Sequence, residues 1–334
     1  MEPPSPRATI ADVALLAGVS RATVSKALND KYRVDPETRD RVRRAAEDLG
    51  YRASVRAQRL RGGRSHTIAL ITALPAPIVG EASQLGFLLD LALPTAQACL
   101  EHGYSLLLVP PIESSDALDM LDVDGAIVID PVSADPYCAA LRSRGVSVVS
   151  IGRAESADVD ACVDRGAAGA EVMLPHLAAR GARHALVLMS EEDFSITATI
   201  EQHLASRPAD GLRISTVRAP AGGGEESGRI ATLAALDREP GIDAVYAPLD
   251  AFAVGALAAA REKGLSVPGD LMVATNYDGR RATSSEPALT ALDLRLPAIA
   301  RSAVTLLLSV LAGVSPADAS APVPSVVERA STRR

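Results

Sequence analysis

The sequence predicts a small all-α helix-turn-helix domain at the N-terminus, followed by an α/β core of two lobes with doubly wound parallel sheets. Residues 9–50 carry apolar side chains at helical spacing, interrupted by capping residues and glycines. Beyond a glycine pair at 62–63, short apolar strands alternate with helices, and the alternation restarts near Gly166. We therefore expect one domain over 1–63 and a core over 64–334.

The helix-turn-helix is predicted from its caps. Thr9 can cap a first helix, with Asp12 placed for the reciprocal bond, and Gly18 can end that helix in the left-handed conformation. Ser20 is positioned to cap the second helix. The outer face of that helix carries short and cationic side chains, which suit contact with base edges and phosphates: Arg21, Ala22, Ser25 and Lys26. The alternative is a helical hairpin with a solvated charged face.

A third helix and an uneven charge distribution strengthen the first interpretation. Asp35 precedes Pro36, a pair typical of a helix start, and Gly50 follows the last turn. Residues 1–66 contain 14 Lys and Arg against 8 Asp and Glu, whereas the remainder contains 20 against 33. A basic head on an acidic body favours a nucleic-acid-binding protein whose body does not adhere to DNA.

Residues 9–63 resemble the DNA-binding headpiece of the LacI/GalR (lac-repressor) family of bacterial transcriptional regulators. The matching segments are 10–14, 17–20, 23–25, 28–29, 38–39, Val42, 49–51 and 57–60. The resemblance implies a hinge helix near 54–61, although Ala53 and Ser54 stand where the family usually has a Pro-Asn pair. It also implies these DNA contacts: Thr9, Ser20, Arg21, Ala22, Thr23, Ser25, Lys26, Asn29, Arg56, Ala57, Arg59 and Leu60.

The core is predicted from the alternation of its elements. We expect strands at 67–72, 105–109, 125–129, 146–151, 185–189, 213–217, 244–247 and 271–275. Helices are expected at 88–102, up to 144, and at 166–180, 196–206 and 228–236. Two successive sets of this kind indicate two lobes with a cleft between them.

The core also resembles the family, whose core is similar to periplasmic sugar-binding proteins. The match rests on Asp250, 253, 255–257, 264, 267–268, 270, 277–278, 287, 289–290 and 329–332. The resemblance implies a homodimer built by the core, a small-molecule effector in the cleft, and allosteric control of the spacing between two heads. It further implies three crossings between the lobes, which we place near 153–163, 280–293 and 312–324.

Candidate effector contacts are Phe87, Arg153, Phe194, Asp250 and Asp278. For each, another role is open: core packing for the phenylalanines, a surface position for the arginine, and a backbone cap for Asp278. Leu249 stands where the family often has asparagine, and no arginine lies between Arg183 and Arg207. The cleft therefore favours a neutral or cationic, partly apolar effector, or a glycoside donating to Asp278, over a sugar phosphate.

Other classes of site find little support. Cys99, Cys138 and Cys162 show no paired spacing, which argues against zinc and disulfides and suits a reducing cytoplasm. The glycines at 222–224 lack the lysine of a phosphate-binding loop, and the acids at 191–193 are typical of a solvated helix start. No apolar run is long enough to span a membrane. We expect no catalytic site, metal or cofactor.

Together these observations predict a sequence-specific DNA-binding transcriptional regulator, most simply a dimeric repressor. Its partners would be a near-palindromic double-stranded DNA operator and a small, possibly sugar-like, effector. Two alternatives stay open. One is a regulator controlled by a protein partner, and the other is a ligand-binding protein or enzyme that merely carries a basic arm.

Overall fold

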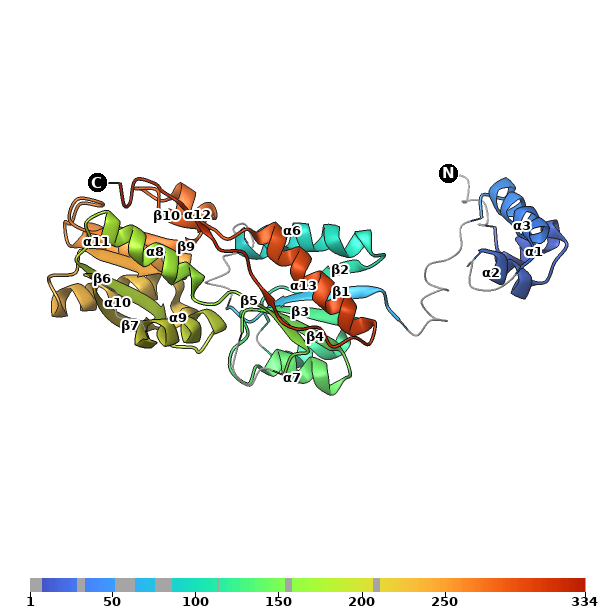
Figure 1. Ribbon diagram of the computed structural model, residues 1–334, viewed down its shortest axis with the longest axis horizontal. Helices are drawn as coiled ribbons and strands as arrows, with labels where there is room; N and C mark the ends of the chain where they lie inside the picture. The colour runs from blue at the N-terminus through green and yellow to red at the C-terminus, as the bar shows by residue number, and fades with distance from the viewer. Residues whose placement is uncertain are drawn as a thin grey trace, which may run out of the picture. The chain divides into compact units, whose positions relative to one another are not determined.

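The computed structural model describes residues 8–28, 34–51, 64–75, 86–112, 114–153, 158–206 and 211–333. The chain divides into two compact units, Met1–Ser65 and His66–Arg334, and each is described by itself (Figure 1). In the described part of the chain, no helix combines the length and apolar character needed to cross a membrane.

The first unit contains three helices: α1 (Ile10–Ala17), α2 (Arg21–Leu28) and α3 (Pro36–Asp48). They pack around a small core in which Val13, Val24 and Val42 are fully buried. Asp35 caps α3, because its carboxylate accepts a hydrogen bond from the Thr38 N–H at 3.0 Å. Each helix therefore contributes one apolar stripe to this core, while α1 also exposes Leu15 and Leu16.

The turn between α1 and α2 is formed by the expected residues. The Asp12 carboxylate accepts from the Thr9 N–H at 2.8 Å and from its hydroxyl at 2.7 Å. Gly18, with φ 64°, ends α1 in the left-handed conformation. The Ser20 hydroxyl accepts from the Thr23 N–H at 3.1 Å and so caps α2. The predicted helix-turn-helix is confirmed.

The first lobe of the core is built on a six-stranded sheet with the order β11-β5-β4-β3-β1-β2, in which every neighbouring pair is parallel. Helices α6 and α13 pack on one face, and α7 with the 3₁₀ helix η1 packs on the other. The bounds are β1 Thr67–Thr72, α6 Gly86–Glu101, β2 Ser105–Leu108, η1 Ser115–Met120, β3 Gly125–Ile129, α7 Pro136–Ser143, β4 Ser147–Ile151, β5 Ala161–Asp164, α13 Leu296–Leu311 and β11 Ala319–Ser320.

The second lobe repeats this plan with the order β12-β10-β9-β8-β6-β7, except that β12 runs antiparallel to β10. Helices α10 and α11 cover one face, while α8 and α9 cover the other. The bounds are α8 Ala168–Ala179, β6 His184–Ser190, α9 Ser195–Ser206, β7 Arg213–Ala219, η2 Ala221–Gly223, α10 Gly224–Arg238, β8 Ala244–Ala247, α11 Asp250–Glu262, β9 Met272–Tyr277, α12 Arg280–Ser284, β10 Thr290–Asp293 and β12 Ser325–Val327.

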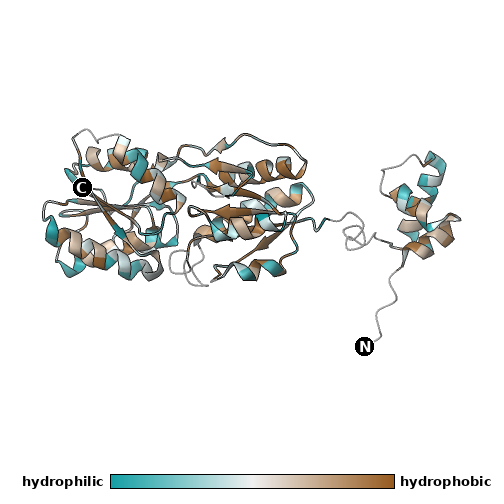
Figure 2. Cartoon of the chain, turned by 90° about the horizontal axis from the view of Figure 1, so that it is seen from below, coloured by the Kyte–Doolittle hydropathy of each residue, from teal (hydrophilic) through white to brown (hydrophobic). Residues whose placement is uncertain are grey.

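Hydropathy follows this layering, since Figure 2 shows hydrophobic strands inside both lobes. The predicted fold class is confirmed: an all-α headpiece and a two-lobed α/β core with doubly wound, mainly parallel sheets. The chain crosses between the lobes at 165–167, 294–295 and 321–324. The first two crossings come later than predicted, because β5 and β10 still belong to the lobe that the chain is leaving.

The strand order fixes where a cleft forms. In the first lobe β1 pairs with both β2 and β3, and in the second β6 pairs with both β7 and β8. At such switch points successive connections leave on opposite faces of the sheet, so that a crevice opens at the carboxyl ends of the strands. Leu74 and Asp130 follow β1 and β3, and Leu249 follows β8. These residues therefore mark the crevice.

Candidate DNA-binding helix and ligand cleft

Helix α2 presents the side chains predicted to contact DNA. Val24 and Ala27 are buried against α1 and α3. Because these residues fix the inner face, the outer face is left to the polar and short residues. Ser20, Arg21, Ala22 and Lys26 are exposed, while Thr23 and Ser25 are partly exposed. The helix start thus offers N–H groups, hydroxyls and cations on one accessible surface, a combination that binds phosphates and base edges.

The remaining predicted DNA contacts are only partly within the described residues. Thr9 is exposed at the start of α1. The other positions, together with the predicted hinge helix, lie outside the described residues: Asn29, Arg56, Ala57, Arg59 and Leu60.

A cavity of about 50 Å³ lies between the two lobes of the core. Its walls come from the carboxyl ends of strands in both lobes, from the N-termini of helices and from two crossings. The lining residues are Leu74, Phe87, Asp130, Arg165, Ile196, Pro248, Leu249, Asp250, Asn276, Tyr277 and Leu294. Apolar side chains dominate, and the polar groups are gathered into a few pairs.

Two of the five candidate effector residues line this cavity, Phe87 and Asp250. Phe194 is buried in the hydrophobic core, in agreement with the alternative considered for it. The Arg153 guanidinium donates to Asp164 at 2.9 Å and to Asp318 at 2.7 Å, all within the first lobe and away from the cavity lining. The candidate roles of Phe194 and Arg153 as direct cavity contacts therefore find no support in the geometry.

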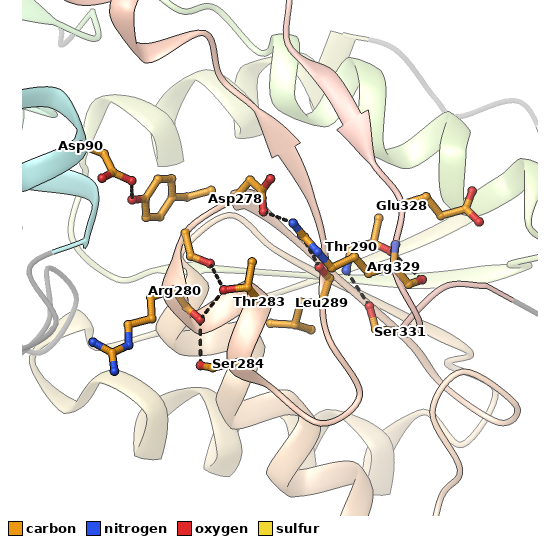
Figure 3. Close-up of polar contacts among 12 residues, drawn as sticks. Asp90, Asp278, Arg280, Thr283, Ser284, Leu289, Thr290, Glu328, Arg329 and Ser331 are labelled. Carbon is orange, nitrogen blue, oxygen red and sulfur yellow. Dashed lines mark hydrogen bonds and ion pairs between the residues drawn. The ribbon is translucent and has the colours of Figure 1, made fainter. Parts of the chain in front are cut away.

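Asp278 also lies outside the cavity lining, because its carboxylate faces the C-terminal segment. Arg329 forms an ion pair with Asp278 at 2.5 Å and donates to the Leu289 carbonyl at 3.0 Å (Figure 3). In the same segment, the buried Ser331 hydroxyl accepts from the Thr290 N–H at 2.8 Å. Asp278 thus ties the last residues of the chain to the second lobe, and it lines a separate groove of about 530 Å³ beside α6. Its role as an effector contact stays a prediction.

Asp250 is a second buried carboxylate of the cavity, besides Asp130. It begins α11, and Arg281 on α12 lies 3.4 Å from its oxygen. Arg281 also donates to Glu225 at 3.1 Å. Burial raises the pKa of Asp250 to about 6, and the positive charge of Arg281 opposes that increase only in part. The carboxyl therefore titrates near neutral pH.

A second polar pair had no counterpart in the predicted site. Asp130 follows β3, and its carboxylate accepts from the Ser195 hydroxyl of the other lobe at 2.7 Å and from Arg165. The position of Asp130 directly after the strand at 125–129 was a signal that could have identified it. Arg165 was missed because the first crossing was placed too early in the chain.

Tyr277 lines the cavity and separates it from the outer surface of α6. Its hydroxyl donates to the Asp90 carboxylate on α6 (Figure 3). Its ring meets Phe87 edge to face, with centroids 5.1 Å apart. The sequence suggested that Phe87 stacks on an effector. In the structure its aromatic partner is Tyr277.

Comparison with known proteins agrees with both units. Residues 9–54 match the model of bacterial regulatory proteins of the lacI family, and residues 174–332 match that of a periplasmic binding protein-like domain. The chain is 30% identical to the HTH-type transcriptional regulator reg1 of Streptomyces lividans, over 97% of this chain and 96% of that protein.

Two solved structures show the same fold. A complex of the transcriptional regulator CelR with cellobiose has 25% identity and a TM-score of 0.67, covering 97% of this chain and all of that one. A lac repressor dimer bound to operator and an anti-inducer has 21% identity and a TM-score of 0.73, with 98% and 100% covered. The chain therefore belongs to the lacI family of bacterial regulatory proteins and is a DNA-binding transcriptional regulator.

Proposed function

We propose that this regulator is a dimeric repressor that binds a near-palindromic operator. Its affinity for the operator would change when a small effector occupies the cleft. The exposed basic face of α2 carries the proposal, because it presents hydroxyls and two cations on a helix whose other face is buried. Two such helices would enter successive major grooves. Arg21 and Lys26 would contact guanines or phosphates, and Thr9, Ser20, Ala22, Thr23 and Ser25 would lie against the DNA.

The dimer would form through α6. This helix exposes Leu89, Leu93 and Leu100, at exposed fractions of 47%, 75% and 68%. The spacing places them along one side of the helix, beside a groove of about 530 Å³. Large exposed apolar stripes of this kind are typical of protein–protein interfaces. A second copy of the chain would cover the stripe and bring two headpieces to one operator.

The effector would be uncharged and partly apolar. Arg165 is paired with Asp130, and Arg281 with both Asp250 and Glu225, so the guanidinium groups beside the cavity already face carboxylates. A sugar phosphate would have to compete with these carboxylates. The buried Nε of Arg165 has no hydrogen-bond partner among the described residues, which favours a ligand with an acceptor atom. A glycoside meets both conditions, and one relative has been solved with cellobiose.

The cleft gives no support to catalysis, since its two lining carboxylates are held by guanidinium groups. We accordingly propose a regulator without enzymatic activity that works in the cytoplasm, where its DNA target would be found.

Fluorescence anisotropy with labelled operator tests the proposed DNA-binding face. Arg21→Ala should weaken specific binding by roughly 1–3 kcal/mol. Loss of a phosphate contact would also reduce the slope of log affinity against log salt concentration by about one. Arg44→Ala is the matched control, because Arg44 is an exposed cation on α3 rather than α2. Removal of residues 1–66 should abolish binding. Retained affinity in that truncated chain, or equal losses for both arginines, would refute the proposal.

A further inference from the structure

The cavity between the lobes is small for a site that binds a small molecule. Pockets for small molecules usually measure roughly 300–1,000 Å³, whereas this one measures about 50 Å³. The difference is explained by what fills the cleft. Among the residues that the structure describes, side chains and backbone of the two lobes meet directly at the two places considered below, and the cavity is the space left between them.

The first place is the Ser195 contact, which joins the loop after β3 to the start of α9. The Ser195 hydroxyl donates to the Asp130 carboxylate at 2.7 Å, and the Ser195 N–H donates to the Pro131 carbonyl at 3.1 Å. Val132 and Phe194 add an antiparallel bridge. Ser195 and Asp130 are 2% and 3% exposed, so that water is excluded from these bonds. The contact fits closely, because a Cβ on Gly152 would lie 2.1 Å from the Ser195 hydroxyl.

The second place is the Tyr277 contact, which joins the end of β9 to α6. The Tyr277 hydroxyl donates to Asp90, and its ring packs against Phe87. A Cβ on Gly86 would lie 3.3 Å from the tyrosine oxygen, so that α6 begins directly against the tyrosine. Tyr277 itself is 8% exposed. Both contacts bring a hydroxyl of the second lobe to a carboxylate of the first.

We propose that the Ser195 and Tyr277 contacts close the core through the protein's own side chains, so that an effector of disaccharide size must separate the lobes to bind. The contacts lie on different walls of the cavity, and each restricts a hinge motion that would widen it. A ligand needing several times the available volume would have to break at least one of them. Effector binding would then open this core, because the ligand competes with bonds that already join the lobes.

The test is a pulsed electron-spin distance measurement on the full-length protein. Spin labels are placed on Met120→Cys in the first lobe and Ile230→Cys in the second, since both side chains are exposed. The native Cys99, Cys138 and Cys162 are buried, and burial raises the pKa of each thiol, so they should react slowly. Labelled chains are diluted with unlabelled chains so that one subunit carries both labels.

We expect one narrow distance in the otherwise unaltered protein, and a second, longer distance in Ser195→Ala and Tyr277→Phe. Loss of a hydrogen bond to a charged group should raise the open-to-closed ratio by roughly tenfold or more for each variant, and by the product in the double variant. The matched controls are Ser150→Ala and Tyr137→Phe, whose hydroxyls donate within the first lobe, at 2.9 Å to the Gly152 carbonyl and 2.7 Å to the Ile112 carbonyl. They should keep the single distance.

A broad distribution in the protein with both contacts intact would overturn the proposal. An unchanged distance in the double variant would do the same, as would equal opening in the controls. The measurement requires neither DNA nor effector. Its failure would therefore leave the proposed operator binding untouched, whereas failure of operator binding would not alter these distances.

Discussion

The headpiece and the cleft differ in how their functional residues come together. The candidate DNA contacts on α2 lie within one turn and one helix, at 20–26, and their direction follows from the burial of Val24 and Ala27. The cleft is assembled from residues as distant as Leu74 and Leu294. A local pattern defines the first surface, whereas only the packing of two sheets defines the second.

This difference has a physical consequence for the two sites. The cationic side chains on α2 are solvated, so each can be replaced at little cost to the fold, whereas Ser20 also caps the helix. The polar groups of the cleft are buried and paired. Removal of one therefore leaves a buried polar or charged group without its hydrogen-bond or ion-pair partner. Substitutions in the headpiece should therefore change DNA affinity, and substitutions in the cleft should also change stability.

The largest effect on stability is expected at Asp250. Its pKa is raised to about 6 by burial, whereas an unfolded chain has about 3.9. The folded state therefore holds the proton more tightly, and the free energy of unfolding should fall as pH rises from about 4 to about 6. The loss should be on the order of 3 kcal/mol. Asp250→Asn should remove this part of the pH dependence.

Urea unfolding of both proteins at pH 4, 5, 6 and 7 measures the effect, and the difference between the two curves isolates Asp250 from other titrating groups. Curves that run parallel across this range would show that the buried carboxyl does not couple folding to pH. That result would contradict the expectation that substitutions in the buried cleft, unlike those in the solvated headpiece site, change stability.

A smaller effect, confined to DNA binding, is expected at Leu60. The family resemblance places this leucine in the minor groove at the centre of the operator, where an apolar wedge exchanges base stacking for added contacts. Leu60→Ala should weaken operator affinity by about 10- to 100-fold and reduce DNA bending, while thermal stability stays unchanged. If the leucine instead packs on the core, the variant would unfold at lower temperature and bind the operator as before. Gel mobility of bent complexes and calorimetry distinguish these outcomes.

The sequence was sufficient for the three described helices of the headpiece and for the fold class, and the reasons are local. Caps at Ser20 and Asp35 and the glycine at position 18 fix helix ends through contacts a few residues apart. The alternation of strands and helices fixes the parallel sheets. Neither depends on distant partners.

The cleft was predicted only in part, because its chemistry depends on distant pairs. Asp278 carries the expected type of side chain, but it pairs with Arg329, far along the chain, and lies outside the cavity lining. Arg153 is likewise held by Asp318. Conversely, Asp130 and Arg165 meet in the cavity although neither has a sequence motif around it. Position after a strand end was the only available signal for Asp130, and it does not reveal which partner the side chain will find.

Selection of bound sequences from random double-stranded DNA by the full-length protein tests the central claim most directly. A dimer with one helix-turn-helix per subunit should enrich a near-palindromic motif whose two half-sites are related by the two-fold symmetry of the protein. Arg21→Ala should reduce enrichment at matching positions in both half-sites. Enrichment of no sequence at all, or of a motif that the truncated chain lacking residues 1–66 selects equally well, would contradict the assignment of the headpiece as the operator-reading domain.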